Sequence, residues 1–99
     1  MIKETEKMGI AYLKAFGFSD EQVNPLVEIG IKDINNTLSK IEILLEETHP
    51  SIEELNNLLH ALKGLLFQMG NTALGEKINE MRSHLSEDDI LEIKELLFF

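Results

Sequence analysis

The segment that decides the fold, at residues 51–70, reads SIEELNNLLHALKGLLFQMG. Ser51 and Glu54 have the spacing of a capping box, in which two side chains satisfy free backbone amides at the start of a helix. Gly70 is of the residue type that commonly ends a helix. We therefore expect a helix from Ile52 to about Met69.

One side of this helix is apolar along its whole length. With Leu62 at the centre of a helical wheel, six further apolar residues fall within about 60° of it. They are Leu55, Leu58, Leu59, Leu65, Leu66 and Met69. This stripe has the period of an amphipathic helix, so we expect it to be buried.

The opposite side carries a different set of residues. His60 lies about 160° from Leu62, and Gly64 lies beside it one turn later. A glycine inside a helix costs about 1 kcal/mol relative to alanine. An exposed one therefore indicates a kink in the helix, another helix that crosses closely, or the close approach of a partner. The other residues on or beside this face are Asn57, Lys63, Phe67, Gln68 and Asn71.

The rest of the chain follows the same helical period. A first helix is expected over residues 2–16, closed by Gly17. Ser19 and Gln22 have the spacing of a capping box, which starts a second segment. Because proline breaks a hydrogen bond inside a helix but fits its first turn, Pro25 predicts a short turn at 19–23 and then a long helix from Asn24 to about Glu47. The apolar stripe of this long helix is Val27, Ile31, Ile34, Leu38, Ile41 and Leu45.

Two shorter helices are expected after Gly70. Asn71 or Thr72 caps the first of them, and the spacing of Ser86 and Asp89 indicates a capping box for the second. Their inward residues are Leu74, Ile78, Met81 and Leu85 in one helix and Ile90, Ile93, Leu96 and Leu97 in the other.

These patterns predict a single all-α domain over residues 1–99. Four amphipathic helices with short connections bury their apolar stripes most simply as an antiparallel four-helix bundle, here over 19–97. Residues 1–17 then form an extra N-terminal helix. The alternative, a longer coiled coil, is disfavoured because Pro and Gly interrupt the chain and no heptad repeat is sustained.

Composition narrows the possible partners. The 99 residues carry a net charge of −9, which disfavours nucleic acid and anionic membranes. No segment approaches the ~20 apolar residues of a membrane span, and no secretory signal is recognisable. A cytoplasmic location is the resulting expectation. The chain has no cysteine, which excludes disulfides and thiol chemistry.

The eleven residues from His60 to Gly70 resemble the signature of histidine-containing phosphotransfer (HPt) domains. That signature is a histidine, any residue, an aliphatic residue and Lys-Gly, then an amide four residues after the glycine, an aliphatic residue and a glycine. In this chain the positions are His60, Leu62, Lys63, Gly64, Gln68, Met69 and Gly70. The chain departs from the family at Leu65 and Leu66, where small residues are common, and at Phe67, which is bulkier than usual.

The resemblance implies a carrier that holds a phosphoryl group on an exposed histidine in a two-component relay. His60 matches the phosphoacceptor, and Lys63 is expected to neutralise the added charge. The implied partner is the receiver domain of a response regulator or hybrid histidine kinase, whose aspartate gives or takes the group. Magnesium is expected on the receiver, and no cofactor on this chain. The expected partner-binding residues are Asn57, Gly64, Phe67, Gln68 and Asn71.

The residue types suit this chemistry. Neutral imidazole is a nucleophile, and most imidazole side chains are unprotonated at neutral pH. We expect Nε2 to attack, because it projects furthest from the backbone. Lys63, three residues on, can offset the charge of the phosphoryl group. Gly64 leaves room for the partner's loops, and Gln68 can donate a hydrogen bond.

The sequence contains no GxxxxGK[ST] loop or other glycine-rich phosphate cradle, so we expect a carrier and not a kinase. The carrier is either free-standing or part of a hybrid or chemotaxis-type kinase. One alternative is a non-phosphorylated helical adaptor that binds a protein through the His60 and Phe67 face, although Phe67 can instead pack on a neighbouring helix. Another is a metal-dependent or hydrolytic enzyme. Against the latter, His49, His60 and His84 lack metal-ligand spacing.

Overall fold

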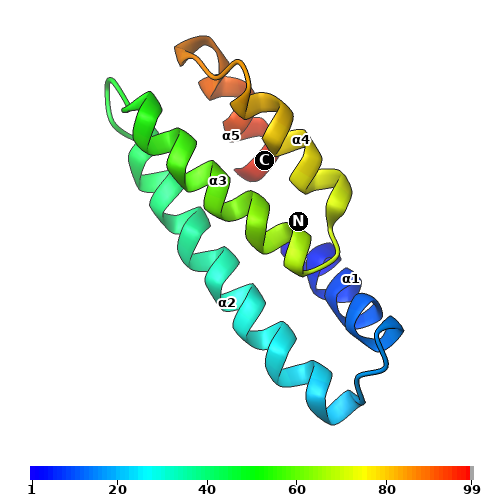
Figure 1. The fold of residues 1–99 in the computed structure, drawn as a ribbon. Coiled ribbons are helices and arrows are strands. Elements are labelled where there is room, and N and C mark those ends of the chain that lie inside the picture. Colours follow the sequence, from blue (N-terminus) through cyan, green and yellow to red (C-terminus); the bar gives the residue numbers. More distant parts are fainter. Residues whose placement is uncertain (99) are drawn as a thin grey trace.

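The computed structural model describes residues 1–98, and every regular element in that range is helical (Figure 1). The helices are α1 (Ile2–Ala15), α2 (Asp20–Leu45), α3 (Ile52–Gln68), α4 (Thr72–Arg82) and α5 (Ile90–Phe98), with a short 3₁₀ helix, η1 (Glu87–Asp89), before α5. The all-α prediction is therefore confirmed. Within the same range, no helix combines a membrane-spanning length with a sufficiently apolar sequence.

Helices α2 and α3 form the centre of the molecule and run side by side in opposite directions (Figure 1). Helix α4 packs along α3. The long helix α2 is flanked by different elements at its two ends. Helix α1 lies beside residues 24–31 of α2, and α5 lies beside residues 42–46. Each of these two shorter helices thus packs against only one half of α2.

The core is built from the stripes that the helical period predicted. In α3 the buried residues are Leu55, Leu59, Leu62 and Leu66, which are at most 1% exposed. In α2 the predicted stripe is buried except for Ile31, which is partly buried and still packs against the core. Helices α4 and α5 add Ile78, Met81, Ile93 and Leu97. Burying apolar surface at about 25 cal/mol per Å² is the main stabilising contribution here.

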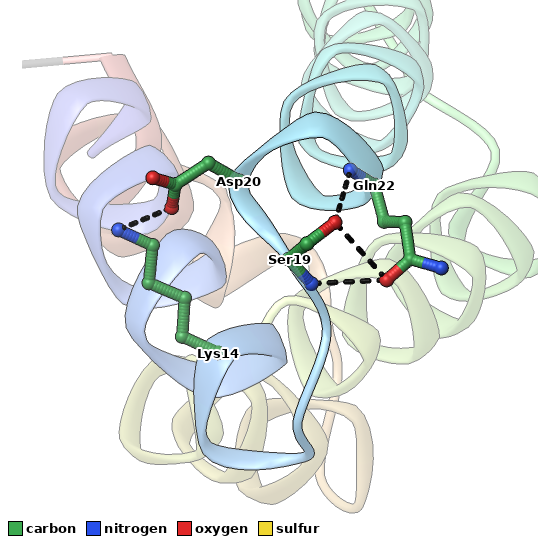
Figure 2. Close-up of polar contacts among 4 residues, drawn as sticks. All are labelled: Lys14, Ser19, Asp20 and Gln22. Carbon is green, nitrogen blue, oxygen red and sulfur yellow. Dashed lines mark hydrogen bonds and ion pairs between the residues drawn. The ribbon is translucent and has the colours of Figure 1, made fainter.

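The start of α2 differs from the sequence-based expectation. The helix begins at Asp20 and not at Asn24, because the Ser19 capping box starts an α-helix directly. The Ser19 amide donates to Gln22 Oε1 at 2.9 Å, and the Gln22 amide donates to Ser19 Oγ at 3.4 Å (Figure 2). Lys14 of α1 pairs with Asp20 at 2.8 Å across the same connection (Figure 2).

Pro25 consequently lies inside α2, one turn later than the sequence analysis placed it. Its ring cannot donate the hydrogen bond that would otherwise reach the carbonyl of Glu21. Both residues are exposed, so the carbonyl is on the solvent side of the helix. The reason for the error is that a strong cap can start a helix upstream of a proline when the lost hydrogen bond faces water.

Met69, at the end of α3, packs between α1 and α2. Its side chain fills the space left by two glycines that have no side chain of their own, Gly9 on α1 and Gly30 on α2. An added Cβ at either glycine would lie 2.5 Å from the nearest Met69 atom. This contact fixes the position of α1 and also the level of α3 along α2.

The other predicted helix boundaries are confirmed, with one refinement. Gly17 and Gly70 follow α1 and α3 with φ of +93° and +74°, the left-handed region that favours glycine. Asn71 caps α4 by accepting the Leu74 amide at 3.4 Å. The capping residues Ser86 and Asp89 first start the 3₁₀ helix η1, and α5 begins only at Ile90.

Replacing either of these positive-φ glycines by alanine should lower the free energy of unfolding, but by different amounts. Gly17→Ala should lower the free energy of unfolding by about 1–2 kcal/mol, because only backbone strain is added where no atom lies within 4 Å. Gly70→Ala should cost about 1–3 kcal/mol more, because its Cβ would lie 2.8 Å from the Tyr12 Cβ on α1. Urea denaturation of both variants measures the difference. Equal costs would mean that the Tyr12 contact does not matter for stability.

Candidate functional site

The rotation of α3 is set by its buried leucines. Leu62 is 0% exposed, at the centre of the stripe that packs between α2 and α4. His60 lies almost on the opposite side of the helix and is exposed, as predicted. A helix that is buried on one side and partly covered on two flanks has only a narrow strip left in contact with solvent. His60 lies on that strip.

An open groove of 490 Å³ runs between α2 and α3 and includes His60. Helix α3 contributes His60, Gly64 and Gln68 to its lining, together with Ala61 and Leu65. Helix α2 contributes Asp33, Asn36, Thr37 and Lys40. Three of the predicted site residues are therefore brought together along one groove. The four groove residues of α2 were not predicted from the sequence.

Gly64 has no packing explanation in the part of the chain that the structure describes. Three other glycines lie inside helices, and each is filled by a neighbouring side chain: Met69 fills the space at Gly9 and Gly30, and Phe67 the space at Gly75. An added Cβ at Gly64 would meet nothing within 4 Å. Among residues 1–98 no crossing helix requires a glycine there, which removes one of the explanations left open by the sequence. The missing side chain leaves an open space one helical turn from His60.

Lys63 lies on the other flank of His60, away from the groove. It is one helical turn before Phe67, so the two side chains share a side of α3. Phe67 faces α4, because its ring would lie 2.6 Å from a Cβ added at Gly75. Lys63 is half-buried on this α4 side and forms no ion pair among residues 1–98. Its ammonium group is therefore available next to His60.

Phe67 occupies one of the two positions that the sequence left open, whereas Asn71 does not lie where the helical wheel placed it. The ring of Phe67 covers Gly75 and is partly buried, so the neighbouring-helix explanation of this residue is the one the structure supports. Asn71 is only 5% exposed. Its Nδ2 donates to Thr5 Oγ1 at 2.9 Å, while its Oδ1 caps α4. The helical wheel failed for Asn71 because α3 ends at Gln68 and the chain turns at Gly70.

The two remaining predicted residues are exposed. Gln68 lines the groove two turns after His60, on the side that faces α2. Asn57 lies one turn before His60 and does not line the groove. A residue at either position is accessible to a docking protein. Gln68 is the one whose amide shares an open space with the imidazole.

The other two histidines do not line the groove. His49 is exposed in the loop before Pro50, and His84 lies 3.6 Å from Asp89 near the start of η1. Among residues 1–98, no three His, Asp or Glu side chains gather as a metal site would require. His60 is thus the histidine that stands beside a groove, an ammonium group and an unfilled glycine.

Comparison with protein-family models, curated proteins and solved structures finds no match to this chain. A functional interpretation therefore depends on the chemistry of the His60 face.

The packing of the helical glycines predicts opposite effects for two alanine substitutions. Gly64→Ala should raise the free energy of unfolding by about 0.5–1 kcal/mol, because helix propensity improves and no atom is displaced. Gly75→Ala should lower it by about 1–3 kcal/mol, because the Phe67 ring must move. Chemical denaturation tests both variants. A destabilised Gly64→Ala chain would show that Gly64 has a structural role after all.

Proposed function

We propose that this chain is a histidine phosphotransfer protein that carries a phosphoryl group on His60. The observation that carries the proposal is the unfilled glycine: Gly64 lies one turn from an exposed imidazole, and no neighbouring side chain among residues 1–98 occupies the space. A glycine that weakens an exposed helix without a packing reason is best explained by the close approach of another molecule. The resemblance of the His60–Gly70 segment to HPt domains points to the same conclusion.

The proposed architecture is that of the HPt family, an antiparallel four-helix bundle made of α2, α3, α4 and α5. Its support is the contact of α3 with both α2 and α4, together with the contact of α5 with α2. Helix α1 is then the extra N-terminal helix. Met69 packs between Gly9 and Gly30 and so holds α1 against the bundle. This contact lies at the end of the bundle opposite to the α2–α3 loop.

The proposed reaction is an in-line transfer between imidazole and carboxylate. The Nε2 lone pair of His60 attacks the phosphorus of a phospho-aspartate on the receiver. The N–P bond forms as the P–O bond to the aspartate breaks, and the aspartate leaves as a free carboxylate. The reverse step passes the group on to another receiver. Such a transfer depends mainly on positioning and on neutralising charge.

Each neighbouring residue has a part in that transfer. Lys63 reduces the electrostatic cost of placing a dianion on a protein whose net charge is −9. Gly64 lets the receiver's backbone approach the imidazole. Gln68 supplies an amide donor within the same groove. The receiver holds the magnesium ion, and this chain acts as a carrier without an ATP site of its own.

The proposal predicts that His60→Gln abolishes phosphorylation by a phosphorylated receiver. The wild-type chain should gain an acid-labile adduct of ~80 Da, as expected for one phosphoryl group on a histidine. His49→Gln and His84→Gln are matched controls that should keep the adduct. Intact-mass spectrometry before and after acid treatment provides the measurement. An adduct that persists in His60→Gln would place the acceptor elsewhere.

The same experiment separates the carrier from the adaptor. An adaptor would bind its partner equally well with or without His60 and would show no adduct. It would use Phe67, but the ring of Phe67 covers Gly75 of α4 and is only partly accessible. This contact is the reason for preferring the carrier.

A second prediction concerns the space at Gly64. Gly64→Gln should slow phosphotransfer from the receiver by at least about tenfold, because a side chain would keep the two reacting groups apart. The chain should remain folded, since glutamine is a better helix former than glycine. Circular dichroism checks the fold, and stopped-time phosphotransfer assays give the rate. An unchanged rate would mean that the partner does not approach through Gly64.

A further inference from the structure

The groove beside His60 contains a cation that the proposed function has not used. Lys40 of α2 lines the same groove as His60, Gly64 and Gln68. Lys63, by contrast, lies on the opposite flank of His60, toward α4. A phosphoryl group on Nε2 would therefore have Lys63 on its α4 side and the groove residues of α2 on its other side.

The contact between Met69 and Gly30 shows how far along the groove Lys40 lies. A Cβ on Gly30 would be 2.5 Å from the Met69 sulfur, so these two residues are at the same level. His60 is nine residues before Met69, and Lys40 is ten residues after Gly30. Because α2 and α3 run in opposite directions, both steps lead the same way, by about 14 Å and 15 Å at 1.5 Å per residue. Lys40 and His60 are thus level across the groove.

The ammonium group of Lys40 is not committed to a carboxylate. Within residues 1–98 it forms no ion pair. The positions one turn away on either side of it are Asn36, Thr37, Ile43 and Leu44, none of which is acidic. On a chain with eighteen acidic residues and nine basic ones, such a lysine is a local exception.

The charges along the groove are unevenly distributed. Asp33 lines the same groove but lies seven residues from Lys40, about 10 Å along the helix axis. On its other side, Lys40 also lines a neighbouring pocket together with Glu47 and Glu54, with which it forms no ion pair. A dianion in the groove is therefore favoured at the level of Lys40 and repelled at both ends. This level coincides with that of His60.

We propose that Lys40 is a second phosphate-binding residue, which holds the phosphoryl group on His60 from the α2 side while Lys63 holds it from the α4 side. This assignment rests on the proposed function and adds a residue from a different helix. A lysine side chain can span the distance between packed helices, whose axes are typically 8–10 Å apart. The phosphoryl group would then be bound between two ammonium groups.

The test uses a small phosphoryl donor, so that it does not depend on finding the right receiver. Phosphoramidate transfers its phosphoryl group directly to imidazole: the N–P bond of the reagent breaks, a new N–P bond forms at His60, and ammonia leaves. The reaction is followed by intact mass at one fixed pH for all variants. Peptide mapping identifies the modified histidine.

Lys40→Gln is expected to slow phosphorylation of His60 by about 3- to 10-fold, the effect of removing one nearby cation from a partly solvated dianion. Lys32→Gln is the matched control, because Lys32 is exposed on the same helix, outside the groove, and its loss changes the net charge equally. It should stay within about twofold of the wild type. Lys40→Arg should restore the rate to a similar degree, since it keeps the charge.

The possible outcomes distinguish the two proposals. Equal rates for Lys40→Gln and Lys32→Gln would overturn the assignment of Lys40, while the receiver assay with His60→Gln would still decide the proposed function. A slow Lys40→Gln chain supports the assignment even if no receiver transfers to the wild type. Modification of His49 or His84 in place of His60 would overturn both.

Discussion

The burial of one leucine stripe determines which side chains of α3 face the solvent. Leu55, Leu59, Leu62 and Leu66 are sealed between α2 and α4. Once they are buried, the helix has no rotational freedom, because a turn of α3 about its own axis would expose leucines to water at about 25 cal/mol per Å². The residues on the opposite side are therefore presented to solvent in one fixed orientation. The exposure of the His60 imidazole therefore follows from the packing of the opposite side of the helix.

A second constraint acts along the helix axes. The side chain of Met69 fits where Gly9 and Gly30 leave space, and this contact prevents α3 from sliding along α2. The level of every residue across the α2–α3 groove follows from it. The leucines thus fix the rotation of α3 about its own axis. Met69, packed between two glycines, fixes the position of α3 along α2. Together they place His60 opposite Lys40 by packing alone, without a hydrogen bond between the two helices at that point.

Most of the fold and part of the site could be predicted from sequence, because periodicity and capping act locally. The helices, their caps at Ser19, Ser51 and Asn71, and the exposure of His60 all follow from spacing within one segment. Three features did not follow. The start of α2 depends on a cap outweighing Pro25, and Asn71 lies beyond the end of α3, where a helical wheel no longer applies.

The third missed feature, the α2 wall of the groove, has a different cause. Asp33, Asn36, Thr37 and Lys40 form a polar line on α2, but only the pairing of α2 with α3 shows that it faces His60. A prediction of that pairing needs the relative level of two helices. The clue was present in the sequence as glycines inside helices, at Gly9 and Gly30, which indicate where a large side chain from another helix can sit.

The contact of α1 with Met69 links a remote helix to the geometry of the groove. Helix α1 is anchored around Met69 and Asn71, about 14 Å along α3 from His60. A larger residue at Gly9 would displace the Met69 side chain and would therefore alter the level of α3 along α2. A helix that contributes no side chain to the groove thus helps to set which residues meet across it.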